Sequence, residues 1–403
     1  RKKIHMEKTK LIEDIHKMRF KEIYGGYQSK RLSCEEAAEI LGISVRTFYR
    51  KRKRYDSEDF DESFDLRIGR KSPHRAADKE VEFITKLYAE KYRGFNVRHF
   101  HEFAMREHGF KRSYNWTRNT LTEASLVKKG KRGGDHRLRR ERRPMAGMMI
   151  HQDGSTHRWL PHLDHNLDLI VSLDDATSKI TSAFLVDQEG TLSSMRGIRE
   201  TIESYGIFCS FYTDRGSHYW HTPEAGGKVD KSNLTQVGRA LRQLGIRHIA
   251  AYSPQARGRS ERLFGTLQDR LPKEFALKGI QSIEKANAYL REVYIPRHNE
   301  RFSVAAKESK SAFIASIRED LRDVLCIQEE RVVQNDNTIR YEGLILQIPK
   351  NDLRHHYVRT TVSVHVYEDK TMGIFYGHLC LGKYDELGNL KNEKEELCDK
   401  IAA

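Results

Sequence analysis

The chain of 403 residues is long enough for several domains, and 72 lysines and arginines against 57 aspartates and glutamates give it a net charge of +15. This balance favours a polyanionic partner, with nucleic acid ahead of an anionic membrane surface. Five scattered cysteines without a Cys-x-x-Cys pair argue against a disulfide framework. The lack of a long apolar run and of a P-loop motif argues against a membrane span, and against ATP hydrolysis by this chain.

Residues 33–54 show the pattern of a helix-turn-helix. Ser33 and Glu36 have the spacing of a capping box at the start of one helix, Gly42 permits a tight turn, and Ser44 begins a second helix. We expect the second helix to turn Tyr49 inward and to present a DNA-binding face of Arg46, Thr47, Arg50, Lys51 and Arg54. Residues 1–60 are therefore predicted to form a DNA-binding domain. The alternative is an ordinary helical hairpin with a solvated basic face.

A second helical unit is predicted over 61–127, and the acidic stretch at 56–65 is predicted to be a linker at its start. Apolar residues recur at helical spacing from 78 onward, and Gly109 interrupts the pattern. A helix-turn-helix-like DNA-binding domain and a plain three-helix bundle explain this segment equally well.

Residues 128–145 are almost all positive and contain glycines, so they cannot bury a core and are predicted to form a linker. Such a run also binds phosphates without regard to base sequence. The residues expected to make these contacts are Lys128, Lys129, Lys131, Arg132, Arg139 and Arg140.

The pattern changes at 146–320, where apolar runs typical of strands alternate with helical stretches. The order strand, strand, strand, helix, strand predicts an α/β domain with helices packed on a sheet. Within it, Asp153 ends the first apolar run and Asp214 ends another. Glu261 opens a long helical pattern after a loop that contains Pro254 and Gly258.

These three acids are the candidate catalytic residues. Two divalent cations activate a water or a 3′-OH and stabilise the leaving oxygen of a phosphodiester, and Mg²⁺ prefers carboxylate oxygens on rigid elements. Around Glu261, positive charge that suits DNA comes from Arg257, Arg259 and Arg262. Asp174 and Asp175 also follow a strand, but turn chemistry explains them without a function.

Alternation of period two between 327 and 381 predicts a small β-barrel domain at 321–384, followed by a charged tail at 385–403. The whole chain is thus predicted to be multidomain: α-helical helix-turn-helix units, an α/β core and a small C-terminal β-barrel.

The three acids, with their flanks "HQDGS", "TDRGSHY" and "SPQARGRSERLFGTLQ", resemble those of DDE transposases with a retroviral-integrase-type, RNase H-like core. More narrowly, the chain resembles bacterial insertion-sequence transposases of the ISNCY kind. "YIPRHNERF", with His298 and Asn299, resembles a further element of that family. The segment from Asp214 to Glu261 is longer than the family's commonest spacing, and residues 221–232 resemble an insertion.

The resemblance implies an enzyme that cleaves DNA at transposon ends and joins the 3′-OH to target DNA. Asp153, Asp214 and Glu261 would hold two Mg²⁺ or Mn²⁺ ions. The implied partners are double-stranded DNA, as terminal inverted repeats and target, and further copies of the chain in a homodimer or higher oligomer. The expected location is cytoplasmic, with the bacterial nucleoid. The alternatives are a DNA-binding regulator derived from a transposase and an RNase H-like nuclease.

Overall fold

The computed structural model describes residues 2–56, 75–128, 141–224, 227–252, 258–315 and 321–391. The chain divides into two compact units, residues 1–87 and 88–403. Among the described residues, every helix is too short or too polar to cross a membrane.

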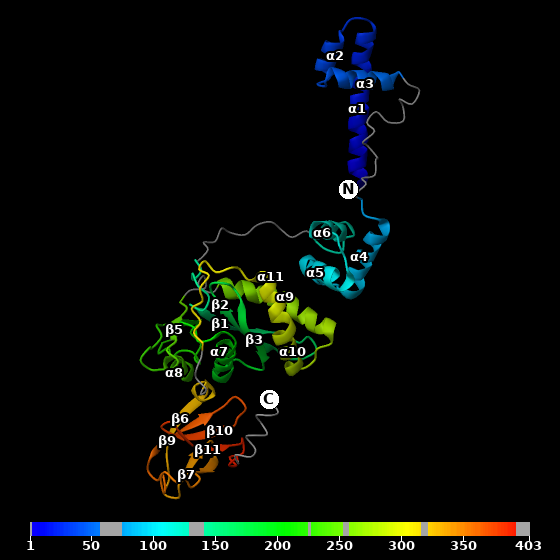
Figure 1. Cartoon of the computed structure of the whole chain (residues 1–403). Helices are drawn as coiled ribbons and strands as arrows, with labels where there is room; N and C mark the ends of the chain where they lie inside the picture. Colours follow the sequence, from blue (N-terminus) through cyan, green and yellow to red (C-terminus); the bar gives the residue numbers. More distant parts are fainter. Residues whose placement is uncertain are drawn as a thin grey trace. The chain divides into compact units, whose positions relative to one another are not determined.

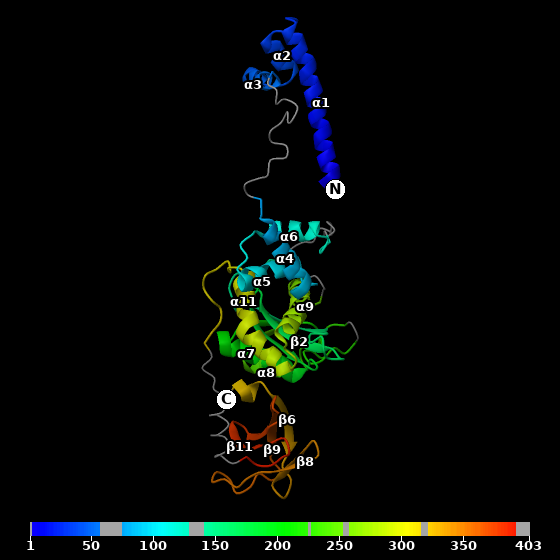
Figure 2. The ribbon, with the colours of Figure 1, turned by 90° about the vertical axis from the view of Figure 1, so that its right-hand side faces the viewer.

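The first unit is built on α1 (Lys2–Gln28), α2 (Cys34–Ile40) and α3 (Val45–Tyr55). Figure 2 shows α2 and α3 packed against the end of α1 that lies farther from the N-terminus. The predicted capping box is present, because Glu36 N donates to Ser33 Oγ at 3.1 Å and Ser33 N donates to Glu36 Oε2 at 2.7 Å. Gly42 makes the turn with a φ of 66°. The helix-turn-helix fold at 33–54 is confirmed.

Two details of this unit differ from expectation. The glycines in "GGYQSKR" predict a break after the first helix, but that helix runs through Gly25 and Gly26, because Phe20 and Tyr24 are buried against Phe48 of α3. Tyr49 is 45 % exposed rather than turned inward, and the Arg52 guanidinium lies 5.1 Å from the centre of its ring. Phe48 and Tyr49 are adjacent on the helix and point in different directions, and Phe48 is the one of the two that reaches the core.

α4 (Asp78–Lys91) crosses the boundary between the units, and α5 (Val97–His108) and α6 (Tyr114–Glu123) belong to the second. Asn96 caps the start of α5, and Gly109 ends it in the left-handed conformation with a φ of 61°. Aromatic rings make the core here: Tyr88 and Tyr92 both contact Phe100. The predicted helical pattern is confirmed for this segment.

A five-stranded sheet in the order β3-β2-β1-β4-β5 forms the centre of the second unit. The strands β1 (Ile150–His157), β2 (Leu167–Asp174) and β3 (Ile180–Val186) are antiparallel neighbours. The shorter β4 (Ser210–Thr213) and β5 (Arg247–Ala250) run parallel to β1. The predicted α/β layout is confirmed.

Helices cover both faces of this sheet (Figure 1). α7 (Thr191–Tyr205) and α8 (Gln236–Gln243) share one apolar core with β1 and β4. On the other face lie α9 (Gly258–Lys278), α10 (Ile283–Tyr289), the π-helical turn η3 (Leu290–Tyr294) and α11 (Ile295–Phe302). The first three of these elements pack on β2 and β3 through buried leucine and aromatic side chains.

Two asparagines complete the hydrogen bonds of the edge strand β3. Asn299 accepts from Ile180 N and donates to Ile180 O, both at 2.8 Å. Asn287 makes the equivalent pair with Leu185, at 2.7 and 3.0 Å. An amide side chain carries a donor NH₂ group and an acceptor oxygen side by side, so it can take the place of the backbone N–H and C=O groups of a neighbouring strand. Asn299, noted above for its resemblance to a family motif, is therefore a structural residue.

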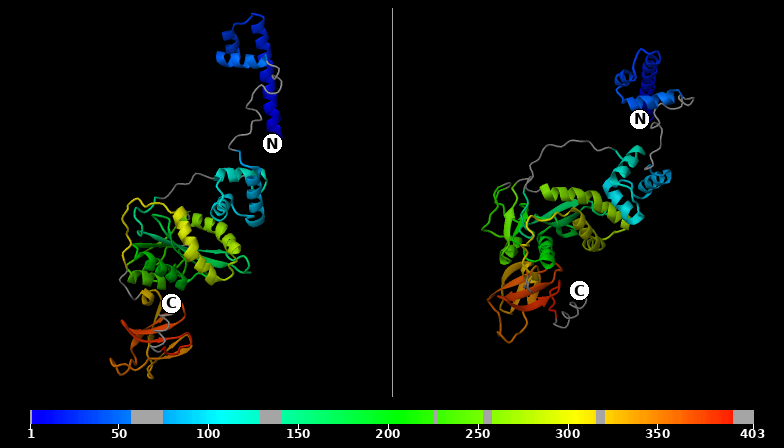
Figure 3. Two further views of the ribbon diagram at one scale, coloured as in Figure 1. Left: turned by 45° about the vertical axis from the view of Figure 1, so that its right-hand side comes forward. Right: turned by 45° about the horizontal axis from the view of Figure 1, so that its top comes forward.

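The C-terminal strands follow the short helix α12 (Leu321–Val324), and Figure 3 shows them gathered in one body, orange to red. They are β6 (Ile327–Val332), β7 (Thr338–Tyr341), β8 (Leu344–Gln347), β9 (Thr361–Val366), β10 (Met372–Tyr376) and β11 (Leu379–Tyr384). Four pair in the antiparallel order β11-β10-β9-β6, and β7 and β8 form a separate hairpin. The predicted strands are confirmed. A closed barrel is not formed by the described residues, because the four-stranded sheet keeps two edges.

Candidate active site

Asp153 and Asp214 are brought together by the parallel pairing of β1 and β4. Ile150 pairs with Phe211 and His151 with Tyr212, and each aspartate lies three residues beyond Ile150 or Phe211. Neighbouring strands are about 4.8 Å apart, so the two aspartates lie side by side at the same level of the two strands. Asp214 directly follows β4, as expected. Asp153 lies inside β1 rather than at its end, because β1 continues to His157 by pairing with β2.

Glu261 lies in the first turn of α9, which packs on the face of β1 that bears Asp153. The apolar face of this helix is buried: Leu263, Phe264, Leu267 and Leu271. Gln268 donates from Nε2 to Ser155 Oγ at 3.0 Å. Because alternate residues of a strand share a face, Ser155 and Asp153 both point toward α9. Gln268 therefore ties α9 to β1.

All three acids line one cleft of about 810 Å³. Asp153 is 9 % exposed, Asp214 is half-buried and Glu261 is exposed, so the cleft passes from a nearly buried floor to an open rim. The remaining lining residues come from β1, from the segments after β4 and β5, and from α9: Gly154, Ser155, Arg215, Gly216, Ala251, Tyr252, Phe264, Gly265 and Gln268.

The donor set of this cleft suits a hard divalent cation, since carboxylate oxygens from rigid elements are what Mg²⁺ and Mn²⁺ prefer. Asp153 and Asp214 come from adjacent strands, and Glu261 comes from a helix packed on them. Within the described ranges, no three such side chains stand close enough together to hold an ion as they are. The carboxylates thus fit a metal in kind and location, without forming a finished coordination cluster.

The backbone around Asp214 is fixed by its own carboxylate. Gly216 N donates to Asp214 Oδ1 at 2.9 Å, which closes the turn after β4. Behind it, the buried Tyr219 hydroxyl donates to Gln152 Oε1 at 2.9 Å. Burial, followed by the negative charges of Glu189, Asp214 and Asp153, raises the pKa of Tyr219 well above its ordinary value. The buried phenol therefore stays neutral behind the cleft.

The competing acids Asp174 and Asp175 have structural partners. Asp174 accepts from Gly147 N and Thr177 N, both at 2.9 Å, as turn chemistry predicted. Asp175 is completely buried and accepts from His151 Nε2 at 2.7 Å. It also pairs with Arg259, near the start of α9. Arg259 is thus engaged inside the protein, and its predicted contact with DNA stays a prediction.

The other predicted DNA-binding residues are placed as follows. On α3, Arg46, Arg50 and Arg54 are exposed, while Thr47 and Lys51 are half-buried. Arg262 is exposed on α9, and its Nε donates to Gly258 O at 3.0 Å. Lys128, the first residue of the predicted linker, is exposed and is the last described residue before position 141. Six lie outside the described residues: Lys129, Lys131, Arg132, Arg139, Arg140 and Arg257.

Two cleft residues were missed by the sequence analysis. Tyr252 is 54 % exposed, and the Arg215 guanidinium lies 5.3 Å from the centre of its ring. An arginine and an exposed aromatic ring at the rim suit phosphates and bases. The signal for Arg215 was its place directly after Asp214, whereas nothing in the local pattern singled out Tyr252.

The second helical unit uses one face of α5 against the core. Arg270 of α9 makes two hydrogen bonds of 2.9 Å to Glu102. His99 Nε2 lies 2.8 Å from Glu274 Oε1, with both side chains almost completely buried. Arg297 also pairs with Glu274, at 2.9 Å. This face of α5 therefore contacts protein, and a DNA-binding role of the unit stays a prediction.

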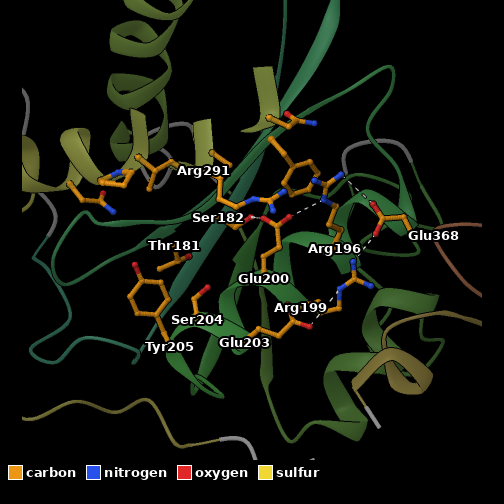
Figure 4. A pocket seen from close by; sticks show the side chains of 16 residues that line it. Thr181, Ser182, Arg196, Arg199, Glu200, Glu203, Ser204, Tyr205, Arg291 and Glu368 are labelled. Atoms are coloured by element: carbon orange, nitrogen blue, oxygen red, sulfur yellow. Dashed lines mark hydrogen bonds and ion pairs between the residues drawn. The ribbon is translucent and has the colours of Figure 1, made fainter. Parts of the chain in front are cut away.

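A second cavity, of about 670 Å³, lies between α7 and the edge strand β3 (Figure 4). Its arginines are matched by carboxylates. Glu368 of the C-terminal sheet accepts from Arg196 at 3.3 Å and from Arg199 at 2.8 Å, and Arg196 also pairs with Glu200. This balance of charge differs from the acid-rich catalytic cleft, and the ion pairs of Glu368 link the turn between β9 and β10 to α7.

The chain is similar to several known proteins. Residues 34–55 match a helix-turn-helix model described as "Bacterial regulatory protein, Fis family". The chain is 29 % identical over 353 residues to "Putative transposase y4bF" of Sinorhizobium fredii, covering 86 % of this chain and 76 % of the relative. It is 28 % identical over 377 residues to "Transposase for insertion sequence IS1202" of Streptococcus pneumoniae, covering 85 % and 79 %. The resemblance to insertion-sequence transposases is confirmed over most of the chain.

Among solved structures, the chain is similar to the intasome of simian T-cell lymphotropic virus in complex with a PP2A regulatory subunit. That match has 15 % identity and a TM-score of 0.34, and it covers 74 % of this chain and 97 % of the other. A further match is the HTLV-2 integrase catalytic core domain in complex with magnesium, with 16 % identity, a TM-score of 0.27 and coverage of 37 % and 89 %.

Proposed function

We propose that this chain is a DNA transposase that cleaves DNA strands at the ends of a mobile element and joins the resulting 3′-OH to target DNA. The observation that supports this most directly is the cleft. Asp153, Asp214 and Glu261 are far apart in the sequence, yet all three line it. The similarity to insertion-sequence transposases and the net charge of +15 support the same reaction.

In this proposal the three carboxylates hold two Mg²⁺ or Mn²⁺ ions. Such ions, when bound, activate the attacking oxygen and stabilise the leaving oxygen of a phosphodiester. The protein holds the three carboxylates in fixed positions. Asp153 and Asp214 come from adjacent strands of a sheet buried on both faces, and the long helix α9 brings Glu261 across them. At the rim, Arg215 and Tyr252 would orient the DNA strand.

Recognition of the element ends falls to the helix-turn-helix at 33–54. Its second helix, α3, exposes Arg46, Arg50 and Arg54 at intervals of four residues, which places them on one face. A recognition helix of this kind enters the major groove, and its basic side chains contact phosphates and guanine edges.

The proposed reaction joins two element ends to one target, so we propose at least a homodimer on DNA. Terminal inverted repeats and target DNA are the proposed partners. A DNA-acting enzyme related to bacterial transposases is expected to work in the cytoplasm at the nucleoid.

The test is to replace each acid singly, as Asp153→Asn, Asp214→Asn and Glu261→Gln. Full-length protein is incubated with Mg²⁺, a labelled duplex with the terminal sequence of the element, and supercoiled plasmid. Each variant should lose cleavage and joining by at least about 10²-fold while it still binds the duplex. Asp187→Asn, an exposed acid after β3, is the matched control and should stay fully active.

Three results would contradict the proposal. Full activity in a triad variant would remove that residue from the site. Specific binding by the wild type without cleavage in Mg²⁺ or Mn²⁺ would indicate a DNA-binding regulator. Cleavage of RNA–DNA hybrids without joining to plasmid would indicate an RNase H-like nuclease.

A further inference from the structure

Two glycines that line the catalytic cleft have charged or aromatic side chains pressed against their other side. Gly154 directly follows Asp153, and a Cβ atom placed on it would overlap the carboxylate of Glu189. Gly216 lies two residues after Asp214, and a Cβ atom there would lie 3.0 Å from Cε1 of His218 and 3.1 Å from Asp214 Oδ1. A side chain at position 154 would have to displace the Glu189 carboxylate, and one at position 216 would be in tight contact with His218.

These side chains lie behind the cleft, on the side of the sheet covered by α7. Asp153 and Ser155 point toward α9, so Gly154 between them faces the opposite side. Glu189 stands two residues before α7 begins, and its backbone N donates to Asp168 Oδ2 at 2.7 Å. This hydrogen bond fixes the backbone that carries the Glu189 side chain.

Glu189 and His218 also face each other. Nε2 of His218 lies 3.4 Å from Oε1 of Glu189, with side-chain exposures of 18 % and 25 %. This nitrogen is buried and makes no aligned hydrogen bond with the described part of the chain, so Glu189 is the acceptor within reach. The His218 ring packs on Tyr219, with ring centres 4.0 Å apart.

The pair thus connects two segments that are not paired with each other in the sheet. The parallel ladder of β1 and β4 stops at His151 and Tyr212, before either aspartate. Beyond that point, Glu189 packs against Gly154, which follows Asp153, and His218 packs against Gly216, two residues after Asp214. Their mutual contact links the two segments beyond the point where β1 and β4 stop pairing.

We propose that Glu189 and His218 are positioning residues that set the spacing of Asp153 and Asp214 for divalent cations. This inference rests on the proposed function, because it assumes that these two aspartates bind metal. Neither side chain is required to touch the ion or the DNA. Residues that orient metal ligands in this way change metal affinity or activity by about 10- to 100-fold when they are replaced.

The first test measures Mn²⁺ binding directly. Full-length protein is titrated with Mn²⁺ without DNA, and free Mn²⁺ is followed by electron paramagnetic resonance. Glu189→Ala and His218→Ala should each weaken binding by about 10- to 100-fold. Glu189→Gln keeps an acceptor oxygen for His218 and should stay within about threefold of the wild type. Asp187→Ala removes an exposed acid from the same loop and should change nothing.

Two further variants test the mechanism. The double variant Glu189→Ala/His218→Ala should bind Mn²⁺ about as weakly as either single variant, because both changes break one contact. Gly154→Ala should displace the Glu189 carboxylate and resemble Glu189→Ala, which provides a second route if the alanine variants fold poorly. Thermal unfolding in EDTA shows which variants fold.

Wild-type affinity in both alanine variants would overturn the inference, and so would losses that multiply in the double variant. A loss in Glu189→Gln as large as in Glu189→Ala would make Glu189 a metal ligand instead. The proposed function is tested separately by wild-type cleavage. A chain that cleaves but whose variants bind Mn²⁺ normally refutes only the positioning role, and a chain that shows the variant effects but never cleaves refutes only the transposase.

Discussion

Asp153 and Asp214 occupy equivalent positions on adjacent parallel strands, each three residues beyond the paired Ile150 or Phe211. Two carboxylates held side by side in this way repel each other, and a divalent cation between them removes that repulsion. The wild-type chain should therefore gain thermal stability when Mg²⁺ or Mn²⁺ is added.

Asp153→Asn should abolish this metal-induced rise in the unfolding temperature. Without metal, the same variant should be at least as stable as the wild type, by up to about 1 kcal/mol, because one of two neighbouring charges is gone. Differential scanning fluorimetry with EDTA and with Mg²⁺ measures both effects. A variant that keeps the full metal-induced shift would show that the ion binds elsewhere, and Asp187→Asn serves as the control.

Asn299 provides the next prediction. Its amide makes two hydrogen bonds of 2.8 Å to the backbone of Ile180 on the edge strand. Asn299→Ala leaves that donor and acceptor without their partner and should lower the free energy of unfolding by roughly 1–3 kcal/mol. Asn299→Asp should cost at least as much, because a carboxylate cannot donate to Ile180 O. Urea unfolding measures the change.

The exposed Asn233 gives a matched control for that experiment, since its replacement by Ala should leave the free energy of unfolding within about 0.5 kcal/mol of the wild type. A stable Asn299→Ala variant would mean that water or a neighbouring strand satisfies the edge of β3 without the amide.

These residues show what the sequence reveals. The helix-turn-helix was predictable because Ser33, Glu36 and Gly42 act through local geometry alone. The cleft acids were predictable because Asp214 and Glu261 stand where apolar patterns start or stop. Asn299 was noticed in a motif, but its partner Ile180 is 119 residues away, and no local pattern reveals such a contact.

The same limit explains what was wrong or missed. The α1 helix continues through Gly25 and Gly26 because packing against α3 outweighs the low helix propensity of glycine. Period-two alternation identifies strands but does not say which strands pair, so four strands and a hairpin were taken for a barrel. The contact of Glu189 with Gly154 joins two segments that are far apart in the sequence, and neither segment has a local pattern that predicts it.

The third prediction concerns acid stability and Glu274, which is 3 % exposed. Burial raises the pKa of this carboxyl, but hydrogen bonds from His99 and Tyr289 and the charges of His99 and Arg297 outweigh burial and lower the pKa from 4.5 to about 2. A carboxyl whose pKa is lower in the folded chain than in the unfolded chain stabilises the fold at pH values above its unfolded-state pKa. That contribution, roughly 3 kcal/mol, is lost as the pH falls from about 4.5 toward 2.

Glu274→Gln should therefore be less stable than the wild type at pH 6, and the difference should shrink as the pH falls from 5 to 3. Urea unfolding across this range measures it. Glu203→Gln, at an exposed carboxyl on α7, should follow the wild-type curve. Parallel curves for Glu274→Gln and the wild type would show that this carboxyl does not control the acid limb.

The last prediction tests which residues of α3 contact DNA. Arg46, Arg50 and Arg54 are exposed on one face of the helix. Each arginine that binds a phosphate releases about one counterion, so its removal should reduce the slope of log affinity against log salt by about 0.9. The three single alanine variants should each weaken binding of the element end by roughly 3- to 30-fold.

Lys30→Gln, at an exposed lysine between α1 and α2, removes the same charge from the turn and should leave the slope unchanged. Fluorescence anisotropy between 50 and 200 mM salt provides the measurement. An arginine variant whose slope matches that of the wild type makes no phosphate contact, and if its affinity still falls on the element end but not on unrelated DNA, that side chain contacts bases instead.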